Sequence, residues 1–183
     1  MTTIRRETRE TSVNVSVRTD LATDGAIETG EPFLDHMLGT LARYSGLHLA
    51  IEATGDLRHH LIEDVAISLG LALRDVIPER CARYGNAVVP MDDALVQAAL
   101  DAGGRFYYRG RLGSKLYEHF FRSLAENAAM TLHLRVLRGR DRHHVVEAAF
   151  KAFGLALRQA LVPTGAVFST KGSVRVSRED NGC

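Results

Sequence analysis

The sequence predicts an α+β fold of two similar halves with two sheets, and two observations lead to this prediction. The segment HHLIEDVAISLGLALR at 59–74 aligns with HHVVEAAFKAFGLALR at 143–158, with eight identical residues in sixteen. The offset of 84 residues is close to half of the 183-residue chain, so a duplication explains the repeat better than a long solenoid does. Helical and strand patterns are mixed within each half, which is typical of the α+β class. We expect a first half over 1–88, a second half over 89–174 and a disordered polar tail over 175–183.

The elements of the first half follow from hydrophobic periodicity. SVNVSV at 12–17 alternates apolar and polar residues, which predicts a strand. Residues 31–46 predict a helix, because a proline stands at an early helical position, apolar residues follow at helical spacing and a glycine ends the pattern. LHLAIEA at 47–53 alternates and predicts a strand, and 59–77 predicts a helix that a proline terminates.

The second half repeats this scheme. Residues 94–101 and 104–110 are predicted strands joined by a glycine turn. A helix over 115–129, a strand over 130–137 and a helix over 143–161 follow, and Pro163 stops the last helix.

Composition and charge exclude several classes of protein. The net charge is +1, which argues against nucleic acid as the main partner. No apolar run approaches the roughly 18 residues of a membrane span, and the N-terminus lacks the apolar region of a secretory signal. Two cysteines form no disulfide framework, so we expect a reduced, cytoplasmic protein. Residues 1–90 carry net charge −4 and residues 91–183 carry +5, so the basic half would meet either an anion such as phosphate or the acidic half of a neighbouring subunit.

Histidine placement is the most specific feature of the chain. All eight histidines fall in the repeat as four matched pairs. The pairs are His36 and His119, His48 and His133, His59 and His143, and His60 and His144. A glutamate follows each doublet, four residues after its first histidine. His48 and His133 alternate with leucine inside predicted strands, which indicates a structural role.

The HHxxE spacing predicts two metal ions. At the start of a helix, residues i and i+4 share a face, whereas residue i+1 is rotated by about 100°. His59 and Glu63 would therefore chelate one ion while His60 points toward a second, and the second motif repeats this arrangement. One further histidine from each half would complete four protein ligands per ion. The predicted ligands are His36, His59, His60, Glu63, His119, His143, His144 and Glu147.

The ligand chemistry narrows the choice of metal. Imidazole and carboxylate without thiolate suit manganese, iron or zinc. Four protein ligands leave open positions on a six-coordinate ion, which favours manganese and is what a catalytic site needs. Whether one chain closes the site or each ligand pair faces its counterpart in a neighbouring subunit stays open, and we expect a homo-oligomer.

The chain resembles the imidazoleglycerol-phosphate dehydratase family of histidine biosynthesis nearly end to end. The residues that carry the resemblance are RETSVNVSV, PFLDHML, ATGDL, HHLIED, FFRSLAENAAMTLH, HHVVEAAFKAFGLALRQA and STKG. The resemblance implies four-stranded halves with helices packed between the two sheets, as in ribosomal protein S5 domain 2-like folds. It also implies the same eight metal ligands, two Mn²⁺ per active site and a 24-subunit assembly with sites between subunits.

Further site residues are implied by the resemblance alone. Glu10 matches a glutamate at the substrate end, and Asp92 matches an active-site acid. The other implied substrate and phosphate contacts are Arg83, Arg105, Lys151, Ser169 and Lys171. Two features depart from the family pattern: only Arg58 separates ATGDL from the first doublet, and Phe168 stands where proline is common before STKG. Without a phosphatase domain in this chain, we expect the monofunctional form.

The predicted reaction is a hydro-lyase reaction, the loss of water from imidazole glycerol phosphate to give imidazole acetol phosphate through a di-manganese-bound imidazolate. Glu10, Glu63, Glu147 and Asp92 are the candidate catalytic acids, and the basic residues would anchor the phosphate. Two alternatives stay open. A di-metal phosphoesterase would use several aspartates, which are sparse in these motifs, and a non-catalytic metal-binding or assembly protein would need no phosphate-binding cluster.

Overall fold

The structure is a computed structural model that describes residues 1–20 and 25–165, and it contains two four-stranded sheets. The first sheet has the strand order β1-β2-β4-β3 and the second the order β5-β6-β8-β7. The strands of the first sheet are β1 (Thr2–Glu7), β2 (Thr11–Arg18), β3 (Ile27–Glu28) and β4 (His48–Gly55). Those of the second are β5 (Tyr84–Met91), β6 (Ala94–Asp101), β7 (Tyr107–Arg111) and β8 (Thr131–Arg138). In both sheets one pair is parallel, β3 with β4 and β7 with β8, and the other pairs are antiparallel.

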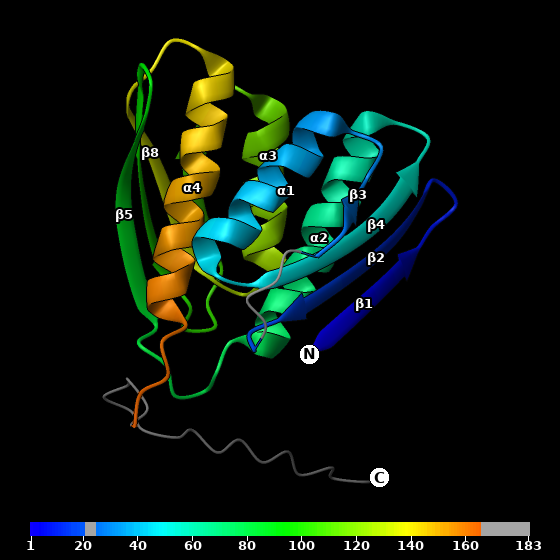
Figure 1. Cartoon of the computed structure of the whole chain (residues 1–183), viewed down its shortest axis with the longest axis horizontal. Helices are drawn as coiled ribbons and strands as arrows, with labels where there is room; N and C mark the ends of the chain where they lie inside the picture. Colours follow the sequence, from blue (N-terminus) through cyan, green and yellow to red (C-terminus); the bar gives the residue numbers. More distant parts are fainter. Residues whose placement is uncertain (21–24, 166–183) are drawn as a thin grey trace, which may run out of the picture.

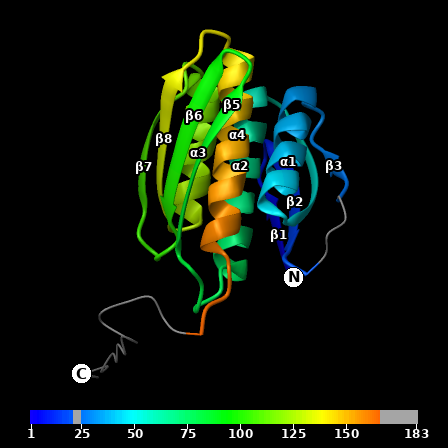
Figure 2. The same cartoon turned by 60° about the vertical axis from the view of Figure 1, so that its left-hand side comes forward.

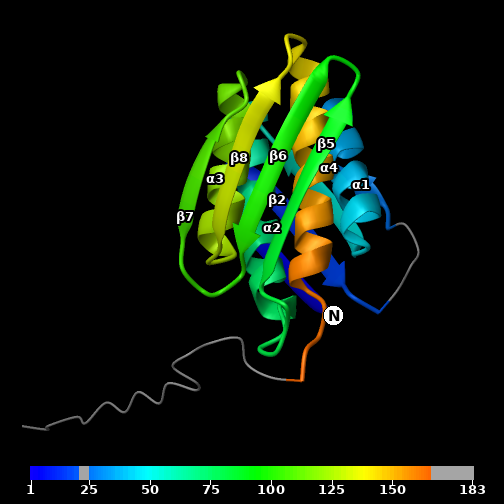
Figure 3. The same ribbon diagram turned by 90° about the vertical axis from the view of Figure 1, so that its left-hand side faces the viewer.

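Four helices form a layer between the two sheets (Figures 1 and 2). They are α1 (Pro32–Ser45), α2 (Arg58–Val76), α3 (Lys115–Asn127) and α4 (Arg142–Ala160). Helix α2 packs on β1 and β2. Helix α4 packs on β5 and β6, as Figure 3 shows. The predicted α+β fold of two similar halves is therefore confirmed, including the helices between the sheets.

Each predicted helix and strand corresponds to an observed one with ends within three residues. Three strands, β1, β3 and β5, have no counterpart among the predicted elements. Strand β5 carries Pro90 and Gly85, which weaken a strand signal, and it lies at a sheet edge, where such residues are tolerated. Strands β6 and β7 do not form a hairpin, because β8 lies between them. The expected division after residue 88 falls inside β5, and the expected tail over 175–183 lies outside the described residues.

The helix layer is built from pairs that join the two halves. Helix α1 packs against α4, and α3 packs against α2. Gly154 and Gly70, at equivalent positions of the repeat, allow these close crossings. A Cβ at Gly154 would lie 2.9 Å from Cβ of Tyr44 in α1, and one at Gly70 would lie 2.6 Å from the carbonyl oxygen of Leu124 in α3. Each HHxxE helix is thereby held against a helix of the other half.

Buried aromatic rings fill the space between the second sheet and the helices. Phe120, Phe121, Phe150 and Phe153 are fully buried. The ring centroid of Phe150 lies 4.7 Å from that of Phe121 and 5.1 Å from that of Phe120. These contacts fix α3 against α4 and leave the N-terminal ends of the helices to form the candidate site.

No helix in the described ranges 1–20 and 25–165 has the length and apolarity that crossing a membrane requires.

Candidate metal centre

The first group of potential metal ligands, which we call triad A, is formed by His36, His143 and Glu147. His36 lies one turn into α1, and the other two lie in the first turns of α4. Oε2 of Glu147 is 3.5 Å from Nε2 of His36 and 3.2 Å from Nε2 of His143. The glutamate is buried, whereas both histidines are about half exposed. The α1–α4 crossing thus brings a histidine of the first half to the HHxxE motif of the second.

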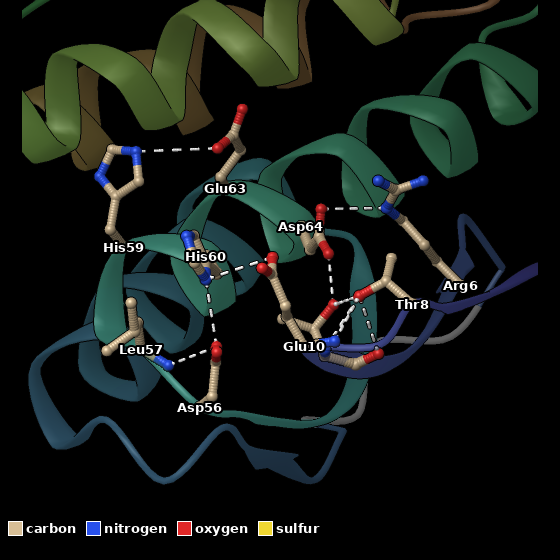
Figure 4. A network of polar contacts seen from close by, with 10 residues as sticks. Arg6, Thr8, Glu10, Asp56, Leu57, His59, His60, Glu63 and Asp64 are labelled. Carbon is tan, nitrogen blue, oxygen red and sulfur yellow. Dashed lines mark hydrogen bonds and ion pairs between the residues drawn. The ribbon is translucent and has the colours of Figure 1, made fainter.

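The second group, triad B, is formed by His59, Glu63 and His119. The first two belong to α2, and His119 belongs to α3. Nε2 of His119 lies 3.0 Å from Oε1 of Glu63. Nε2 of His59 lies 3.7 Å from Oε2 of Glu63, and Figure 4 shows this contact. The rings of His59 and His119 are stacked with centroids 5.1 Å apart. Triad B therefore mirrors triad A with the two halves exchanged.

Both triads fit a divalent cation. In each one the three potential ligand atoms lie within 4.8 Å of one another, so that they face a common point. The Nε2 atom of His119 is buried and forms no hydrogen bond within the described residues, although Glu63 is close. A buried polar atom without a partner is costly, and a bound cation would remove that cost. Imidazole with carboxylate is a donor set that suits manganese, iron and zinc.

The glutamate of triad A stays ionised because of its neighbours. Burial by itself raises the pKa of Glu147, but the Lys151 ammonium and His36 outweigh it and the pKa is lowered overall. Nζ of Lys151 donates to Oε1 of Glu147 at 2.9 Å and to Sδ of Met91 at 3.2 Å. In this chain the predicted phosphate contact Lys151 therefore holds the carboxylate of triad A, with its other oxygen left facing the histidines.

The second histidine of each doublet points away from its own triad. Nδ1 of His60 lies 3.1 Å from Oδ1 of Asp56 and 3.3 Å from Oε2 of Glu10 (Figure 4). Nδ1 of His144 lies 2.8 Å from Oδ1 of Asp93, and its Nε2 lies 3.4 Å from Oδ2 of Asp92. This agrees with the helical rotation between neighbouring residues. Neither histidine belongs to triad A or triad B, and His60 forms a third group of potential ligands with Glu10 and Asp56.

The hairpin that carries Glu10 is tied to helix α2 by a buried acid. Asp64 accepts a hydrogen bond from Nε of Arg6 at 3.0 Å (Figure 4). It also accepts one from the hydroxyl of Thr11. Arg6 and Thr11 belong to β1 and β2, and Asp64 follows directly after Glu63 of triad B. These bonds place the β1–β2 turn, with Glu10, beside the N-terminal end of α2.

Two of the predicted phosphate contacts lie at the opposite end of the molecule. Strand β5 runs from Tyr84, next to Arg83, to the turn whose Asp92 lies beside His144. Eight extended residues span about 25 Å, so Arg83 lies about that far from His144 of its own chain. Nε of Arg83 donates to Asp101 at 2.6 Å, and the carbonyl of Arg105 accepts from Thr131 at the start of β8. Ser169 and Lys171 lie outside the described residues.

The sequence analysis missed two carboxylates of the site, Asp56 and Asp93. Asp56 and Asp93 bind the outward histidines, but Asp93 is distant from the histidine doublets in sequence. The backbone N–H of Arg140, then His144 and the N–H of Asp141, lower the pKa of Asp93 to about 2.

A hollow of about 1250 Å³ also opens between α3, β7 and β8 beside His119. Its cationic side chains, which would attract an anion, are Arg109, Arg111, Lys115, Arg122 and Arg135.

The chain is similar to a known protein family, to curated relatives and to solved structures. The family model described as imidazoleglycerol-phosphate dehydratase matches residues 29–157. The imidazoleglycerol-phosphate dehydratase of Methanoculleus marisnigri is 45% identical, covering 93% of this chain and 97% of the relative. That of Halorhodospira halophila is 46% identical, covering 93% and 96%. The crystal structure of IGPD from Pyrococcus furiosus in complex with (S)-C348 superposes with a TM-score of 0.84 at 43% identity, covering 93% of this chain and all of that one.

Proposed function

Since the chain belongs to the imidazoleglycerol-phosphate dehydratase family, we propose that it is a hydro-lyase of histidine biosynthesis that converts imidazole glycerol phosphate to imidazole acetol phosphate. The observation that carries the proposal is the pair of mirrored triads, each assembled from helices of both halves. We propose a cytoplasmic location, as for other enzymes of small-molecule biosynthesis.

Two manganese ions are the proposed cofactors. The eight residues that would hold them are the two triads together with His60 and His144. Manganese, when bound, would supply the Lewis acidity that favours the imidazolate form of the substrate's ring. The contribution of the chain is a set of ligands in which each glutamate already lies beside two imidazole rings.

The proposed active site lies between subunits of a homo-oligomer, for which the resemblance implies 24 copies. His60 and His144 face outward from their own triads and are thereby available to a neighbouring chain. Arg83 lies about 25 Å from His144 of its own chain, so we propose that it reaches a substrate phosphate at the site of another subunit. Arg105, Lys151, Ser169 and Lys171 are the other proposed phosphate and substrate contacts.

Among the four candidate acids, the structure separates two kinds of environment. Glu63 and Glu147 each lie between two imidazole rings, which suits metal ligands. Glu10 and Asp92 are more than half exposed and lie beside the outward histidines His60 and His144. A proton-transfer group must reach the substrate without being held by a cation, so Glu10 and Asp92 are the better candidates.

A product assay tests the proposal. The purified protein, loaded with Mn²⁺, is incubated with imidazole glycerol phosphate, and both the enolisable ketone and free phosphate are measured. Dehydration gives the ketone with the phosphate ester intact, whereas a di-metal phosphoesterase releases phosphate. Formation of neither product by the manganese-loaded protein would favour a non-catalytic metal-binding protein and contradict the proposal.

A further inference from the structure

The second histidine of each doublet is held by a carboxylate through the same ring atom. Asp56 lies 3.1 Å from Nδ1 of His60, and Asp93 lies 2.8 Å from Nδ1 of His144. An imidazole that donates from Nδ1 keeps its lone pair on Nε2. We propose that Asp56 and Asp93 are positioning residues that fix this tautomer and direct Nε2 outward to the metal. The purpose of this contact rests on the proposed function, but the contact itself does not.

The two carboxylates come from different parts of the fold. Asp56 lies in the loop between β4 and α2, whereas Asp93 lies in the turn between β5 and β6. The duplication places Arg140, 84 residues later, where the second half would carry the counterpart of Asp56. The histidines are thus related by the repeat and their carboxylates are not. A contact inherited as an ordinary surface ion pair would not recur at the same ring nitrogen from two unrelated loops.

Asp93 is itself fixed by the start of α4. Its Oδ2 accepts from the backbone N–H of Arg140 at 2.7 Å and of Asp141 at 3.3 Å, while Oδ1 faces His144. Asp92 is 3.4 Å from the other ring nitrogen of His144, beyond an ordinary hydrogen bond. The shorter contact to Asp93 therefore sets the tautomer.

The two aspartates differ in how they divide their oxygens, and this difference makes the proposal testable. In Asp93→Asn the single amide oxygen stays with the two backbone N–H groups, so the NH₂ group faces His144 and donates to Nδ1. The ring proton then moves to Nε2 of His144, and this nitrogen no longer has a free lone pair with which to bind a metal. Asp56 uses one oxygen for both the backbone N–H of Leu57 and His60. The carbonyl oxygen of an asparagine there keeps both contacts.

The tautomers can be read in the full-length, metal-free protein. Magic-angle-spinning NMR of protein labelled with ¹⁵N-histidine distinguishes protonated from unprotonated ring nitrogens whatever the size of the assembly. Spectra are taken at about pH 9, where neutral imidazole predominates. His60→Gln and His144→Gln assign the signals. Wild type should carry the proton on Nδ1 at both positions. Asp93→Asn should move it to Nε2 of His144, and Asp56→Asn should leave His60 unchanged.

Asp141→Asn is the matched control for Asp93→Asn. It removes a negative charge from the adjacent β8–α4 loop, whose backbone contacts Asp93, and asparagine still caps the N–H of His143. We expect Asp93→Asn to bind Mn²⁺ about 10- to 100-fold more weakly than Asp141→Asn, with unchanged melting and assembly. A wild-type proton on Nε2 of His144, a proton retained on Nδ1 in Asp93→Asn, or equal Mn²⁺ affinity of the two variants would overturn the proposal. Wild-type tautomers as expected in a protein that binds no Mn²⁺ would instead overturn the proposed function and leave the positioning contact standing.

Discussion

Alanine at position 154 tests whether the close approach of α1 and α4 builds triad A. The new Cβ would lie 2.9 Å from Cβ of Tyr44 and 3.1 Å from N of Ser45, so the helices must separate by roughly 0.6 Å to reach ordinary contact. Overpacking of this kind costs about 1–3 kcal/mol, and the higher helix propensity of alanine offsets about 1 kcal/mol. We expect the free energy of unfolding to fall by about 1 kcal/mol, measured by urea denaturation followed by circular dichroism.

The same displacement should affect metal binding. Separation of the helices lengthens the distance between Nε2 of His36 and Oε2 of Glu147, which is 3.5 Å. We expect Gly154→Ala to lose about tenfold in Mn²⁺ affinity, measured from the electron paramagnetic resonance signal of free Mn²⁺. Gly39→Ala is the matched control, because Gly39 lies on α1, the other helix of this crossing, and a Cβ there would meet nothing within 4 Å. It should gain up to about 1 kcal/mol in stability and keep its affinity. Equal stability and equal affinity of the two variants would refute the reasoning.

Three other outcomes follow from packing, charge and ligation. Phe150→Ala should lose about 3–5 kcal/mol in denaturant unfolding, because the ring is fully buried with two others 4.7 and 5.1 Å away; a loss below about 1 kcal/mol would contradict the packing. The hydrogen bonds from Arg83 lower the pKa of Asp101, so their stabilisation is present above the ordinary aspartate pKa of about 3.9 and is lost as the pH falls through the lowered value. The stability advantage over Asp101→Asn should therefore be constant at neutral pH and vanish in acid, and an advantage that persists in acid would count against the pair. His144→Ala should lower metal content and activity together, whereas His48→Ala should retain both; full activity of His144→Ala without metal would refute the metal scheme.

Most helices and strands could be predicted because their signals are local. Helix α1 begins at a proline and ends at Gly46, whose φ of 73° suits glycine, and its apolar face repeats at helical spacing. Strands β2, β6 and β8 alternate buried and more exposed residues over much of their length. Strand β5 was not predicted, because its pairing with β6, and not its own composition, makes it a strand.

Some residues of the candidate site could be predicted from local sequence spacing. His59 with Glu63, and His143 with Glu147, could be paired from spacing alone, since the helix period determines which residues share a face. The predicted outward direction of His60 and His144 depends on the same period. Their carboxylate partners differ, because Asp93 lies 51 residues before His144 and reaches it only through the β5–β6 turn.

The sequence by itself determined the duplication, the helical spacing of the two HHxxE motifs and the chemical type of the ligands, because all three are properties of short segments. Only the tertiary structure decided that His36 joins the HHxxE motif of the second half and that His119 joins the motif of the first half. It also decided that Arg83 lies at the end of β5 farther from His144. The physical reason is that these relations depend on which helices cross and how closely. Glycines at equivalent repeat positions permit that approach, and the packing of four buried phenylalanines holds the layer together.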